Sequence, residues 1–108
     1  MASLKVDDYS RQVIDTYRQN GSHMAPDTAR ASTIAAASTL ASEQGKASIG
    51  DAAKVARTAI DAYEKQARDG VPIDKARENA ARSMSDQFDS RGREMPKQDR
   101  ERSNAIGL

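Results

Sequence analysis

The sequence predicts an all-α protein, a small bundle of three to four helices followed by a disordered C-terminal tail. Three observations lead to this fold class. Alanine, the strongest helix former, supplies about a sixth of the residues. Apolar residues recur three and four positions apart, which is the period of one helix face. No strand-length stretch alternates β-branched with polar residues, and glycine and proline fall between the periodic segments.

The first helix is expected over residues 4–19, where apolar side chains form one stripe. Val6, Tyr9, Val13 and Tyr17 follow one another at spacings of three and four. Such a stripe docks in an apolar groove, either within its own bundle or on another molecule. These four residues are therefore the candidate partner-binding residues.

The second helix is expected over residues 28–44, with Asp27 as its N-cap. Its middle, residues 31–42, holds no charged side chain and consists mostly of Ala, Ser and Thr. A helix without a charged face is not typical of a solvated surface. The sequence therefore predicts that this helix is central, with Ala36 or Ala37 buried against a neighbouring helix.

Two further helices are expected over residues 49–69 and 72–90. Ser48 and Asp51 have the spacing of a capping box at the start of the first of them. Both segments carry an apolar residue every three or four positions. Beyond them no apolar stripe persists and charged residues dominate, so residues 91–108 are expected to be disordered.

These elements divide the chain into an N-terminal amphipathic helix, a linker, a helical core and a polar tail, over residues 1–20, 21–26, 27–90 and 91–108. Gly-Ser-His-Met at 21–24 is identical to the remnant of a widely used protease-cleavage and cloning junction. Two origins therefore stay open for residues 1–20, a native helix or a segment fused to a sequence that starts at Met24. The linker holds no large apolar anchor, so residues 28–90 are expected to fold without the first helix, leaving an apolar groove that it covers.

The composition argues against catalysis and against a metal or cofactor. The chain has no cysteine, which excludes thiolate chemistry and disulfides, and its single histidine, His23, excludes two-histidine metal motifs. The carboxylates mostly lie beside Lys or Arg at helix-surface spacing, and no phosphate-binding or nucleophile motif occurs. We therefore expect no enzyme, no catalytic residues and no cofactor.

The sequence also indicates the cellular location of the protein. No apolar run approaches the roughly 18 residues of a membrane span. The first residues carry Lys5, Asp7 and Asp8 and lack the apolar region of a secretory signal. A soluble, cytoplasmic protein with no membrane partner is expected.

The small apolar inventory favours a function in binding. Burial of the few large apolar side chains barely offsets the conformational entropy that about ninety residues lose on folding. Small bundles with so little apolar surface to bury often need a partner for stability. The sequence predicts a non-enzymatic protein-binding module, an adaptor, inhibitor or accessory factor, that binds another protein or a second copy through apolar helix faces. The alternative is a nucleic-acid-associated accessory protein whose contacts come from the basic residues of the tail, Arg91, Arg93, Lys97, Arg100 and Arg102.

Overall fold

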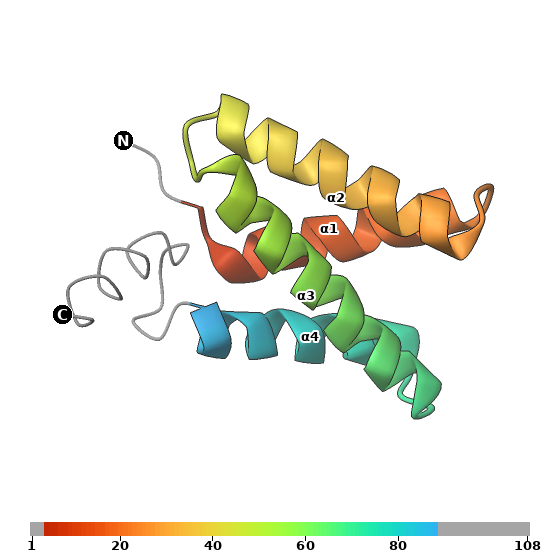
Figure 1. Cartoon of the computed structure of the whole chain (residues 1–108). Coiled ribbons are helices and arrows are strands. Elements are labelled where there is room, and N and C mark those ends of the chain that lie inside the picture. The colour runs from red at the N-terminus through yellow and green to blue at the C-terminus, as the bar shows by residue number, and fades with distance from the viewer. Residues whose placement is uncertain (1–3, 89–108) are drawn as a thin grey trace, which may run out of the picture.

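The computed structural model describes residues 4–88, which form four helices and no strand (Figure 1). The helices are α1 (Val6–Gly21), α2 (Pro26–Glu43), α3 (Ile49–Arg68) and α4 (Ile73–Phe88). The all-α bundle predicted from the sequence is confirmed. The prediction of disorder for residues 91–108 falls outside the described residues.

Local chemistry explains where the helices begin and end. The Ser48 hydroxyl accepts a hydrogen bond from the Asp51 backbone N–H at 3.2 Å, so the predicted cap of α3 is confirmed. The prediction of Asp27 as the N-cap of α2 is wrong, because Pro26 already occupies the first helical turn and Ala25 is the cap. Gly45 and Gly70 end α2 and α3 with φ of +70° and +88°, a conformation that side chains disfavour.

The helix that organises the packing is α3. It contacts each of the other three helices, as does α1, whereas α2 and α4 lie on opposite sides of this pair without contacting each other. Figure 1 shows α3 crossing between α2 and α4. The face that α3 buries is continuous along its length and consists of Ala52, Val55, Ala56, Ala59, Ile60 and Tyr63.

The prediction that the second helix is central is wrong. Only four residues of α2 are buried, namely Ala29, Thr33, Ser38 and Ala41. Ala36 is exposed and Ala37 is only half-buried. Ala, Ser and Thr expose little apolar area in water, so a helix made of them remains at the surface without charged side chains.

The core lies between α1, α3 and α4. Its largest fully buried aliphatic side chains are Val6, Val13, Ile14, Val55, Ile60 and Met84. Alanines of α3 and α4 fill the space between them, since Ala59 and Ala81 are fully buried too. This arrangement places one side of α2 outside the core.

Candidate functional site: the α2 face and the α1–α2 groove

The apolar stripe of the first helix lies within the bundle. Val6, Tyr9 and Val13 are at most 6% exposed, and Tyr17 is half-buried. The Tyr9 hydroxyl donates to the Ala52 carbonyl of α3 at 2.9 Å, and burial raises the pKa of Tyr9. Of the two places that the sequence left open for this stripe, the structure shows docking within the chain. In this fold most of the stripe therefore packs against the rest of the bundle.

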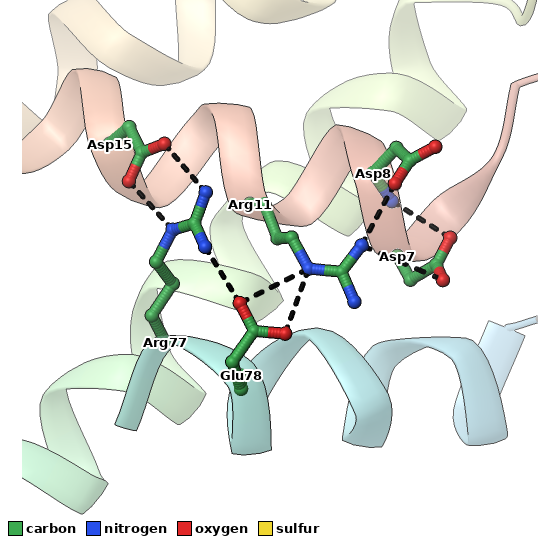
Figure 2. A network of polar contacts seen from close by, with 6 residues as sticks. All are labelled: Asp7, Asp8, Arg11, Asp15, Arg77 and Glu78. Atoms are coloured by element: carbon green, nitrogen blue, oxygen red, sulfur yellow. Dashed lines mark hydrogen bonds and ion pairs between the residues drawn. The ribbon is translucent and has the colours of Figure 1, made fainter. Parts of the chain in front are cut away.

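A charged network closes the outer side of the α1–α4 interface (Figure 2). Arg77 donates to both carboxylate oxygens of Asp15 at 2.8 Å, and its third nitrogen lies 2.6 Å from Glu78. The Arg11 guanidinium lies 3.0 Å from the Glu78 carboxylate and 2.8 Å from the Asp8 carboxylate, so it links the two. The hydrogen bonds to Asp15 are the main reason why the pKa of Arg77 is raised. These side chains use their hydrogen-bonding capacity to hold two helices together.

A second polar cluster joins α1, α2 and α3. The Tyr17 hydroxyl donates to the Glu64 carboxylate, and Arg30 lies 2.6 Å from Asp61 and 3.6 Å from Glu64. Burial, followed by the hydrogen bond and the charge of Glu64, raises the pKa of Tyr17 to about 12. The Tyr17 ring meets the Tyr63 ring edge to face, with centroids 6.5 Å apart. Arg30 is thus the charged residue of α2 that points back into the bundle.

The outward side of α2 has a different character. Between Asp27 and Glu43 every exposed residue of this helix is uncharged. We call these residues the α2 face: Thr28, Ala31, Ala35, Ala36, Thr39, Leu40 and Ser42. Leu40 is its largest apolar side chain and is 52% exposed.

A groove runs between α1 and α2 beside this face. Its cavity volume is about 150 Å³, and its apolar lining comes from Leu4, Tyr9, Val13, Ala36, Ala37, Leu40 and Ala41. Polar groups, Gln12 and Thr16 of α1 with Gln44 and Lys46 beyond α2, complete the lining. We call this cavity the α1–α2 groove. Tyr9 and Val13 thus remain functional candidates through the atoms they present to its floor.

Sequence reasoning missed this site, although its signal was present. The uncharged stretch over 31–42 marks the α2 face, but it was interpreted as a sign of burial. The basic residues proposed to contact nucleic acid, Arg91, Arg93, Lys97, Arg100 and Arg102, lie outside the described residues.

Two properties of residues 4–88 limit other kinds of site. No group of three or more His, Asp or Glu side chains is placed to hold a metal ion. No helix in this range has the length and apolar character needed to cross a bilayer. Comparison with known proteins gives no match to any family model, curated protein or solved structure.

Proposed function

We propose that this chain is a non-enzymatic protein-binding module of the cytoplasm, an adaptor, inhibitor or accessory factor. Its partner is another protein or a second copy of the chain. One observation carries the proposal: Leu40, more than half exposed, stands at the edge of an apolar groove on a helix face without charge. Exposed apolar surface of this kind on a small protein is typical of interaction sites.

The α2 face suits a helix or an extended segment as its partner. Small side chains such as Ala31 and Ala35 allow another backbone to approach to about 8 Å, the short end of interhelical distances. Binding there removes no Lys or Glu from water, so the desolvation cost is low. Leu40 and the adjoining groove supply one anchor and one pocket, the combination that dominates binding energy in protein interfaces.

Site-specific photo-crosslinking in the native host tests this proposal. A photoreactive residue at Thr39 is expected to form a covalent adduct with another protein or with a second copy. The same residue at Lys75, exposed on α4, is the matched control and should form none. Leu40→Glu in the Thr39-labelled chain should abolish the adduct, since it places a charge at the anchor. Equal adducts at both positions, or none at Thr39, would contradict the proposal.

Charge distribution keeps nucleic-acid binding as a second candidate. Residues 4–88 carry 12 basic and 12 acidic side chains, whereas residues 89–108 carry five basic and four acidic ones. The net positive charge of the chain therefore originates in the tail. Phosphate contacts release counterions, so binding through the five tail cations would weaken steeply between 50 and 200 mM salt, by roughly 500-fold if all five contact phosphates. Binding through the α2 face would change little over that range.

A further inference from the structure

The α1–α2 groove lies at the end of the bundle where α4 finishes. Leu4, just before α1, and Lys46, just after α2, both line the groove. Phe88, the last residue of α4, packs against the core cluster that contains Leu4. Figure 1 shows the start of α1, the α2–α3 turn and the blue end of α4 at one end of the molecule. Phe88 and the groove therefore lie at the same end of the bundle.

The sequence after Phe88 contains one short apolar segment. Residues 103–108, Ser-Asn-Ala-Ile-Gly-Leu, have no charged side chain, whereas nine of the fourteen residues before them over 89–102 are charged. Ile106 and Leu108 are two positions apart, so an extended backbone places both on one side. Seventeen residues separate Phe88 from Ile106 and span up to roughly 55 Å when extended. The stretch of α1 from Leu4 to Thr16 measures roughly 18 Å, so the whole groove is within reach.

We propose that Ile106 and Leu108 bind in the α1–α2 groove of their own chain and cover Leu40. A cavity of about 150 Å³ holds an apolar group the size of benzene, so it has room for one of the two aliphatic side chains. The other side chain would then pack against Leu40. Among residues 4–88, Lys46 is the only charged residue that lines the groove, and a segment without basic side chains meets it without repulsion. The tether provides an effective concentration on the order of millimolar, so a weak contact suffices for occupancy.

This inference adds regulation to the proposed function, on which its biological meaning rests. The segment and an external partner would compete for Leu40 and the groove. A partner would therefore bind more tightly when Ile106 and Leu108 are removed from the groove. Docking within the chain is itself a property of the purified protein and requires no partner.

Paramagnetic broadening in the full-length chain tests the inference. Because the chain has no cysteine, Asn104→Cys carries a single nitroxide label next to the apolar segment. The label should remove most of the amide signal of groove residues Thr16, Leu40 and Lys46. Gly70, in the turn at the opposite end of α3, should keep its signal. Adding Ile106→Ser and Leu108→Ser to the labelled chain is the matched control and should restore the groove signals.

Three results would overturn the inference. The groove signals could stay intact in the labelled chain, or broadening could persist in the double serine variant. Broadening could also arise only between molecules, which mixing unlabelled isotope-enriched chains with nitroxide-labelled chains detects, and the occupant would then be a second copy. Since each measurement uses the purified chain alone, failure here leaves the crosslinking result at Thr39 standing as a separate outcome.

Discussion

The two outer sides of this bundle differ in their content of charged side chains. Along the α1–α4 interface six charged side chains, Asp7, Asp8, Arg11, Asp15, Arg77 and Glu78, form one connected network (Figure 2). Along the α2 face no exposed side chain between Asp27 and Glu43 is charged. The first side closes the molecule on itself through complementary charges. The second leaves its uncharged surface open, and this contrast is why we place the binding site there.

The contrast teaches that a helix without charge is not necessarily a buried helix. The buried hydroxyls of α2 bond to their own helix, since Thr33 donates to the Ala29 carbonyl at 2.7 Å and Ser38 to the Ile34 carbonyl at 2.7 Å. Thr33 also accepts a hydrogen bond from the Asn20 amide of α1 at 3.0 Å, so both hydroxyls are satisfied without charged partners. The apolar side chains that require burial are instead supplied by α1, α3 and α4.

The largest expected effect compares the same substitution in the core and on the α2 face. Ala56→Glu places a carboxylate at a fully buried position of α3 and should cost about 4 kcal/mol or more, enough to unfold so small a domain. Ala35→Glu, at an exposed position of α2, should change stability by less than about 0.5 kcal/mol. Circular dichroism melts measure both. Comparable losses would mean that the α2 face is buried in solution, by a second copy or by another part of the chain.

The next comparison removes an aliphatic side chain from each region. Ile14 is fully buried, so Ile14→Ala should cost about 2–5 kcal/mol through lost burial and the cavity left behind. Leu40→Ala removes a side chain that is 52% exposed, and we expect a loss below about 1 kcal/mol. Urea unfolding of the two variants gives the free energies directly. A loss at Leu40 as large as at Ile14 would show that Leu40 is packed like a core side chain, more tightly than weak docking of a tail segment provides.

Much of the fold could be predicted from the sequence because it depends on local chemistry. Glycine and proline positions, the capping serine of α3 and the three- and four-residue spacing of apolar side chains placed the four helices to within a few residues. The relative positions of the helices depend on which faces meet, and that is a long-range property. The mean apolar character of α2 resembles that of a buried helix, yet its side chains are too small to form a core.

The candidate site could be predicted only in part. The stripe of Val6, Tyr9, Val13 and Tyr17 was recognised, but its periodicity does not distinguish a groove in the same bundle from one on a partner. The α1–α2 groove is formed by Tyr9 and Val13 together with Ala36 and Leu40, which lie more than twenty residues away in the chain. No spacing rule connects residues on two different helices.

A smaller effect is expected on the charged side. Arg77→Gln removes the paired hydrogen bonds to Asp15 and the contact with Glu78. Because these groups are partly exposed, the loss should be at most about 1 kcal/mol and should shrink as salt screens the charges. Thermal melts at 20 and 500 mM NaCl measure the difference from the parent. Thr39→Gln on the α2 face is the control and should show no change in salt dependence. A loss at Arg77 that is independent of salt would indicate packing by its aliphatic stem instead.

The smallest effect concerns the inner edge of α2, where Arg30 and Glu64 meet Tyr17. Since the pKa of Tyr17 is raised from 10 to about 12, the folded state holds this proton more tightly than the unfolded state. Its contribution to stability is therefore complete below pH 10 and is lost as the pH rises from 10 to 12. Tyr17→Phe should remove the late step of tyrosinate absorbance at high pH and flatten the fall of stability in this window. Glu64→Gln should shift that step to lower pH, because the neighbouring negative charge is gone while burial remains. If Tyr17→Phe instead removes a step near pH 10, the Tyr17 hydroxyl does not bond to Glu64 in solution. The polar cluster then contributes nothing to holding α2 against α1 and α3, and the buried alanines and hydroxyls of α2 hold it there.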